Sequence, residues 1–245
     1  MRTSRFITST LLVGALVGFA ALSDFGAQAQ QGYPAAKAAV AIDEVINLTA
    51  GVSGGTAGAT ETDWVDILTT QIKTSSQKDL VFDVALQCGI LTDTTVKSSG
   101  GALSSAGARA RIAVKVLVDG QPAEPDNSED INGAFSGGVV YCDRFQQLEA
   151  RFAGLNCTAD PVTGVVTCTD PETLRLLLKS MNANAFNFAK ADVGVGVHTI
   201  KVQAKAMASI VMNNSINLAG AEAFAGAGSL LVEEVRLVKG VQIVF

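Results

Sequence analysis

The feature that most constrains the fold is a run of strict hydrophobic alternation, DLVFDVALQCGILT, from Asp79 to Thr92. A period of two places alternate side chains on opposite faces of an extended strand. One face of such a strand would be entirely apolar, with Leu80, Phe82, Val84, Leu86, Cys88 and Ile90. We therefore expect a long strand that lies over a hydrophobic core.

The same pattern recurs along the chain. Residues 109–118 and 197–211 alternate clearly, and residues 139–152 fit a strand or a helix, with their neighbours favouring a strand. Shorter apolar runs lie at 40–48, 229–238 and 241–245. Segments rich in Gly, Ser and Thr separate these runs. The pattern predicts an all-β chain folded as an antiparallel β-sandwich of the jelly-roll type.

One short helix is expected near residues 171–181. Asp170 can cap it, Pro171 suits its first turn, and Glu172 complements the helix dipole. The following apolar residues form one stripe at helical spacing, namely Leu174, Leu177, Leu178 and Met181.

The first 29 residues have the layout of a secretory signal peptide. Arg2 and Arg5 precede an apolar run at 11–22, and Ala27-Gln28-Ala29 resembles a cleavage site. The run is too short for a membrane helix, and no later apolar stretch is long enough to form one. We expect residues 30–245 to form a single domain that is secreted or held at the cell surface, with the periplasm as an alternative compartment.

Composition narrows the classes of partner. Hydrophobic residues make up 48% of the sequence, which excludes a disordered chain. The net charge is −5 and no basic run is present, so nucleic acid and anionic membrane are not expected partners. The expected partners are a second copy of the chain or an extracellular protein or glycan.

The sequence contains four cysteines, and export would permit disulfide bonds. Cys157 and Cys168 flank a turn with Pro161 and Gly164, and a hairpin there would place the two cysteines opposite each other. Cys88 would then pair with Cys142 by elimination. Buried free thiols are the alternative.

Three segments resemble parts of exported prokaryotic β-rich proteins with no assigned function. They are WVDILTTQIKTSSQKDLVFDVALQCGILTDTTVKS at 64–98, GVHTIKVQAKA at 196–206 and SLLVEEVRLVKG at 229–240. The resemblance implies a compact secreted domain, and it brings no catalytic residue, cofactor or substrate.

Few residues indicate catalysis. His198 is the only histidine, and it shares a strand face with Ile200 and Val202, which favours a partly buried structural role. Asp79 and Asp83 share a face but are too far apart along a strand to share one proton. Glu233 and Glu234 would point to opposite faces. We therefore expect no cofactor, with Ca²⁺ as the one alternative considered.

That hypothesis concerns an acidic loop. Asp126, Ser128 and Asp130 could supply oxygen ligands for Ca²⁺, with Glu124 and Glu129 nearby. The loop lacks the ligand order of an EF-hand, so a solvated surface loop is the favoured interpretation.

These observations predict a non-enzymatic secreted or cell-surface β-sandwich with a structural or binding role. Two alternatives stay open. One is a filament subunit that donates its N-terminal strand, residues 35–48, to the sheet edge of a neighbour. The other is a secreted hydrolase with a carboxylate site at Asp79 or Asp83.

Overall fold

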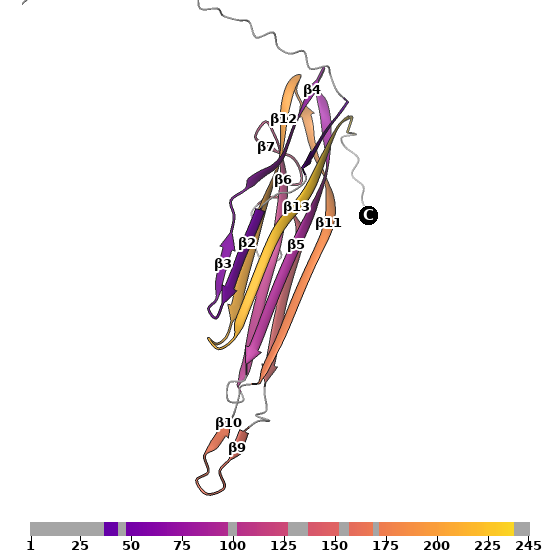
Figure 1. Cartoon of the computed structure of the whole chain (residues 1–245). Coiled ribbons are helices and arrows are strands. Elements are labelled where there is room, and N and C mark those ends of the chain that lie inside the picture. The colour runs from indigo at the N-terminus through magenta and orange to yellow at the C-terminus, as the bar shows by residue number, and fades with distance from the viewer. Residues whose placement is uncertain are drawn as a thin grey trace, which may run out of the picture. The chain divides into compact units, whose positions relative to one another are not determined.

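Two antiparallel β-sheets packed face to face form the domain, as expected from the alternating runs (Figure 1). The computed structural model describes residues 37–43, 48–97, 102–126, 137–151, 157–168 and 172–237. All of them belong to one compact unit that spans Tyr33–Phe245. The predicted signal peptide lies outside the described residues.

The first sheet is built around two long central strands. Its order is β1-β13-β5-β11, and β2 pairs with β13 on the same side as β1. Figure 1 shows β13, β5 and β11 side by side. The strands are β1 (Ala38–Asp43), β2 (Leu48–Gly54), β5 (Lys78–Lys97), β11 (Thr173–Val193) and β13 (Leu218–Val235).

The second sheet has the same plan. β12 and β6 are central, β3 and β4 pair with β12, and β7 and β8 pair with β6. A separate hairpin of two short strands lies between β8 and β11 in the sequence. The bounds are β3 (Gly58–Glu61), β4 (Val65–Thr74), β6 (Leu103–Val118), β7 (Gln121–Pro122), β8 (Val139–Arg151), β9 (Cys157–Ala159), β10 (Val166–Cys168) and β12 (Gly196–Met212).

The chain order of the strands is that of a jelly roll. Strands β1 and β2 belong to the first sheet, β3 and β4 to the second, β5 to the first, and β6 to β8 to the second. The chain then returns to β11 in the first sheet, β12 in the second and β13 in the first. Successive crossings of this kind give two interlocked sheets, as in other double Greek-key sandwiches.

The apolar face of β5 forms the centre of the core, as the alternation predicted. Leu80, Phe82 and Val84 are fully buried. They face the inner side of the second sheet, where β6 and β12 contribute a matching set of buried side chains: Ile112, Val114, Val116, Ile200, Val202, Ala204 and Ala206. The alternation of apolar and polar residues in β5 therefore indicates that one face of the strand is buried in the core, as is typical of a strand in a sandwich.

The predicted helix near 171–181 is wrong. Residues 173–181 lie in β11, a strand of 21 residues that pairs with β5 from Thr173 to Val193. The leucines at 174, 176 and 178 also alternate, and pairing with the long central strand decides between the two periods. Residues 139–151, which fitted either structure, form strand β8.

Candidate functional site

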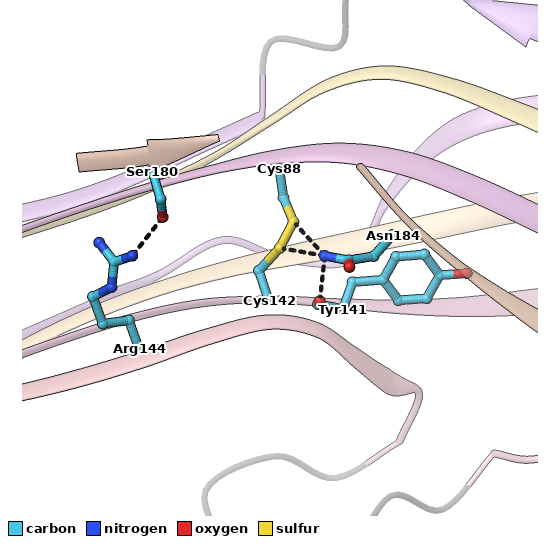
Figure 2. The surroundings of a disulfide bond; sticks show 6 residues. All are labelled: Cys88, Tyr141, Cys142, Arg144, Ser180 and Asn184. Atoms are coloured by element: carbon cyan, nitrogen blue, oxygen red, sulfur yellow. Dashed lines mark hydrogen bonds between the residues drawn. A yellow bond between two sulfur atoms is a disulfide. The ribbon is translucent and has the colours of Figure 1, made fainter. Parts of the chain in front are cut away.

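A disulfide bond between Cys88 and Cys142 joins the two sheets near one side of the sandwich (Figure 2). Cys88 lies on β5 and Cys142 on β8, with their Cα atoms 6.5 Å apart. The pairing inferred by elimination is therefore confirmed. A disulfide is consistent with an oxidising extracellular compartment.

The predicted partner pair, Cys157 and Cys168, occupies facing positions in the β9–β10 hairpin. Asp160 organises the turn between these strands, because its carboxylate accepts hydrogen bonds from the Val162 and Thr163 amides. The side chains of the two cysteines lie outside what the structure describes, so this disulfide stays a prediction.

Strands β8 and β11 lie at the same side of the sandwich, one in each sheet, and polar side chains connect them. We call this side the β8–β11 seam. Asn184 donates from Nδ2 to Tyr141 O at 2.9 Å, and Arg144 donates to Ser180 Oγ at 2.7 Å (Figure 2). Gln146 donates to Leu176 O at 2.7 Å. These bonds hold β11 to the second sheet from the inside.

The seam is also anchored to β5. Gln146 accepts a hydrogen bond from Thr92 Oγ1 and donates to Thr94 Oγ1, and both threonines are fully buried.

Tyr141 makes a second contact with β5, because its hydroxyl donates to Val84 O at 2.8 Å. Burial raises the pKa of Tyr141, and the negative charge of Asp83 raises it further, so the phenol stays neutral. The inner side of the seam is therefore a connected network of polar side chains.

β11 carries exposed apolar side chains on both of its faces. Six of its large hydrophobic side chains are between 39% and 53% exposed, namely Leu174, Leu176, Leu177, Leu178, Met181 and Phe186. Among the described residues, a single bridge covers the outer edge of β11, between Ala189 and Glu124. Within the part of the chain that the structure describes, residues 174–188 therefore form an open edge, which we call the β11 edge.

The bridge at Ala189 reveals which backbone groups of β11 point outward. Ala189 N–H donates to Glu124 O, and Glu124 N–H donates to Ala189 O, both at 2.8 Å. The backbone groups of Ala189 therefore point away from β5. Because this direction alternates along a strand and no bulge interrupts β11 before Lys190, the odd residues 173–187 also point outward.

Strand β8, the other edge of the seam, is protected in the usual way. Four charged residues lie within its 13 residues, namely Asp143, Arg144, Glu149 and Arg151. Charged side chains oppose pairing with a further strand. Over residues 173–188, β11 has only Arg175 and Lys179, and Arg175 forms a bidentate ion pair with Asp93 of the neighbouring strand. The two edges thus differ sharply in their capacity to pair.

His198 makes structural hydrogen bonds between β4, β12 and the β6–β7 turn. Its Nδ1 lies 2.7 Å from Asp119 Oδ2, and its Nε2 lies 2.9 Å from Gly194 O and 3.2 Å from Thr74 Oγ1. The spatial arrangement of Asp119, His198 and Thr74 resembles a nucleophilic triad. However, Thr74 is fully buried and donates its hydroxyl to Gly194 O at 2.5 Å. A nucleophile must reach its substrate, so this geometry favours a structural role.

The carboxylates considered from the sequence are dispersed. Asp79 is buried, and its two carboxylate oxygens accept hydrogen bonds from the Asp192 and Leu237 amides at 2.9 and 2.8 Å. Asp83 is exposed on the outer face of β5. These hydrogen bonds join the ends of β11 and β13 to the start of β5. The geometry therefore favours a structural role for Asp79.

A polar cavity of about 670 Å³ lies beside Asp79, and Glu234 lines it. Its lining mixes acidic and basic side chains: Lys37, Lys78, Asp79, Asp192, Glu234 and Arg236. Glu233 is exposed on the opposite face of β13. The structure therefore does not bring the two glutamates together as an acid and base pair.

The structure describes only one of the three residues that were considered as calcium ligands. Asp126 is described, and its amide donates to Glu124 Oε2 at 3.3 Å. Ser128 and Asp130 lie outside the described residues. Among the described residues, no cluster of three or more His, Cys, Asp or Glu side chains is placed to hold a metal.

Sequence reasoning missed the strand β11, and with it the β11 edge. The signal for a strand was present in the alternating leucines at 174, 176 and 178, which the helical interpretation did not use.

Among the described residues, no helix is both long and apolar enough to cross a membrane.

Comparisons with known proteins assign no family. No family model matches the chain, and no curated protein matches it. A chain from the structure of infectious bursal disease virus, Gx strain, matches 84% of this chain at 8% identity, with a TM-score of 0.13. The match covers 46% of that viral chain, so this chain spans less than half its length. A likeness of this size carries no argument about function. The chain is thus a β-rich protein without a family assignment.

Proposed function

We propose that this protein is a non-catalytic structural subunit of an extracellular or cell-surface assembly, which self-associates through the β11 edge. The main supporting observation is that, among the described residues, β11 leaves its apolar side chains and its outward backbone groups open along residues 174–188. Long, exposed and apolar sheet edges pair readily with further strands. Of the two edges on this side of the sandwich, β8 has a higher proportion of charged residues than β11, which favours β11 as the edge that pairs.

The residues with catalytic potential support a structural role. His198 and Thr74 bond to the Gly194 carbonyl, and Asp79 bonds to two backbone amides. Each of these groups therefore contributes to the packing of the strands. The hydrolase alternative requires activity that is lost when Asp79 or Asp83 is replaced by asparagine.

The test measures the mass of the purified protein in solution by size-exclusion chromatography with light scattering, over a hundredfold range of concentration. Self-association through an exposed edge predicts a mass that rises with concentration from one copy to two or more. A mass of one copy at every concentration would exclude the proposed assembly and favour a monomeric binding module.

A second candidate is assembly by donation of the N-terminal strand. β1 pairs with β13 of its own chain, and its outward side chains Val40 and Ile42 are 57% and 75% exposed. A neighbour's β1 could occupy the same place on β13. Removal of residues 30–48 should then abolish assembly, whereas assembly through the β11 edge should survive the removal.

A further inference from the structure

A small cavity at the β8–β11 seam has the chemistry of an anion-binding site. Its volume is about 190 Å³, which is room for a group of a few non-hydrogen atoms. We propose that this cavity binds an oxyanion, either a carboxylate or a sulfate group. The proposal goes beyond the assembly proposed above and does not depend on it, because it rests on side chains at the inner faces of β8 and β11.

Strand alternation places the polar side chains that line this cavity. Ser180, Asn182 and Asn184 occupy alternate positions of β11, so all three project toward the same face. Asn182 pairs with Cys88 across the ladder, and Cys88 is buried in the core and bonded to β8. This face of β11 is therefore the inner one, and Arg144 extends toward it from β8 (Figure 2).

Arg144 supplies a positive charge and a buried donor. Its Nη2 donates to Ser180 Oγ at 2.7 Å, whereas its Nη1 is buried and has no hydrogen-bond partner among the described residues. No described carboxylate forms an ion pair with this guanidinium. Buried donors in proteins are normally satisfied, and buried charges are normally paired. An oxyanion in the cavity would meet both requirements at once.

Asp143 also lines the cavity, but it does not serve as the counter-charge of Arg144. Its carboxylate lies 2.6 Å from Arg109 Nη2 and 3.2 Å from Arg111 Nη2, and these arginines neutralise it. Alternation along β8 directs Asp143 to the face opposite to Arg144. Arg144 is therefore the uncompensated charge of the lining.

Two further donors lie beside this charge. Ser180 Oγ accepts a hydrogen bond from Arg144, so the hydroxyl hydrogen can be donated into the cavity. Asn182 is exposed, and its side chain makes no hydrogen bond to a described residue, so its amide can donate at the mouth. A guanidinium, a hydroxyl and an amide that line one cavity are suited to the several acceptor atoms of an oxyanion.

Isothermal titration calorimetry of the purified protein with sodium sulfate and with sodium acetate tests this proposal. Sodium chloride at the same ionic strength is the reference, because it reproduces the general effect of salt. Binding at the cavity predicts a saturable heat for at least one of the two oxyanions. A cavity that holds only water predicts no saturable heat for either, and that result would overturn the proposal.

Substitutions then locate the binding. Arg144→Met keeps the length of the side chain and removes its charge, so it should weaken binding at least tenfold. Lys179→Met is the matched control, because Lys179 is next to Ser180 but projects from the opposite face of β11, and its affinity should be unchanged. Equal affinity of Arg144→Met and the unsubstituted protein would place the ion elsewhere and refute the site.

Ser180→Ala provides a second variant that leaves the guanidinium in place. Loss of the hydroxyl donor should weaken binding severalfold, and circular dichroism checks that each variant is folded. If Arg144→Met does not fold, unchanged affinity of Ser180→Ala would by itself exclude the proposed cavity.

The source of the oxyanion is tested with sugars that carry the same groups. Glucuronate supplies a carboxylate and a sulfated hexose supplies a sulfate, and each is titrated as above. Tighter binding than that of acetate or sulfate would identify an acidic glycan as the ligand. Equal affinity would identify the small ion itself, and sugars that fail to bind while the ions bind would lead to the same conclusion.

Discussion

At the scale of single residues, a glycine in the central strand has a specific partner. Gly89 lies opposite Phe224 on β13, and a Cβ built on Gly89 would lie 1.9 Å from the Phe224 ring. The ring therefore covers the bare backbone of the glycine on the outer face of the sheet. Such cross-strand aromatic packing compensates for the missing side chain of glycine.

Gly89→Ala should lower the free energy of unfolding by about 1–2 kcal/mol, because the Phe224 ring must leave its position. Chemical denaturation followed by far-ultraviolet circular dichroism measures the effect. Gly220→Ala on β13 is the matched control, since its nearest atoms lie 3.7 Å or more from the built Cβ. Equal stability of the two variants would show that the ring is not held over Gly89.

The contact between Asp119 and His198 predicts a pH dependence. Partial burial raises the pKa of Asp119, but the hydrogen bonds from His198 and the Thr199 amide lower it more, so the net pKa is below its usual value. A carboxylate with a lowered pKa stabilises the folded state above its unfolded pKa, and this stabilisation is lost as the pH falls through the folded pKa.

Asp119→Asn is therefore expected to reduce stability by about 1 kcal/mol at pH 7, a modest value because the carboxylate is half exposed. The difference from the unsubstituted protein should shrink below about pH 4. Denaturation at neutral, mildly acidic and strongly acidic pH measures it, and a constant difference across this range would contradict the role given to Asp119.

At the scale of structural elements, the Cys88–Cys142 disulfide couples β5 to β8. It closes a segment with a sequence separation of 54 residues. Constraint of the unfolded chain by a loop of this length stabilises a protein by roughly 2–4 kcal/mol. The same bond lies beside the hydrogen bonds that hold β11 to the second sheet.

Replacement of both cysteines by alanine should therefore lower the free energy of unfolding by roughly 2–4 kcal/mol. It should also increase hydrogen exchange of the β11 amides, because the seam loses its covalent support. Hydrogen exchange read by mass spectrometry measures both β11 and β12. If protection fell equally in the two strands, the disulfide would stabilise the whole sandwich without a particular role at the seam.

At the scale of the whole molecule, the proposed pairing joins two chains that each have a net charge of −5. The β11 edge offers backbone groups and apolar side chains, with Arg175 and Lys179 as its charged residues. The net charges of the two chains repel, and salt screens such repulsion.

Self-association is therefore expected to be maintained or strengthened when the sodium chloride concentration rises from about 0.05 to about 1 M. Sedimentation velocity at fixed protein concentration measures the change. Dissociation at high salt would indicate an interface made of complementary charges, and that result would contradict pairing through the β11 edge.

The class of fold follows from the sequence alone, because the side-chain period of a strand is local and is kept in every half-buried strand. The alternation from Leu80 to Ile90 is enough to predict a sandwich core. The hairpin at 157–168 led to Cys88 and Cys142 as partners by elimination, with free thiols as the alternative, and the structure confirms that pair. The sequence could not show whether Asp126, Ser128 and Asp130 converge on one calcium ion, because the positions of ligands in space depend on contacts beyond the local sequence.

By contrast, long-range contacts make residues 173–193 a strand and place this strand at an edge. An edge strand is incompletely buried on both faces, so its apolar residues need not follow one period, and the leucines of β11 fit a helix as well as a strand. The choice comes from β5, whose long backbone offers nineteen paired positions to β11. Which backbone groups remain open likewise depends on Glu124, a residue 65 positions away from Ala189 in the chain. Contacts between distant residues thus set the edge, and local pattern cannot.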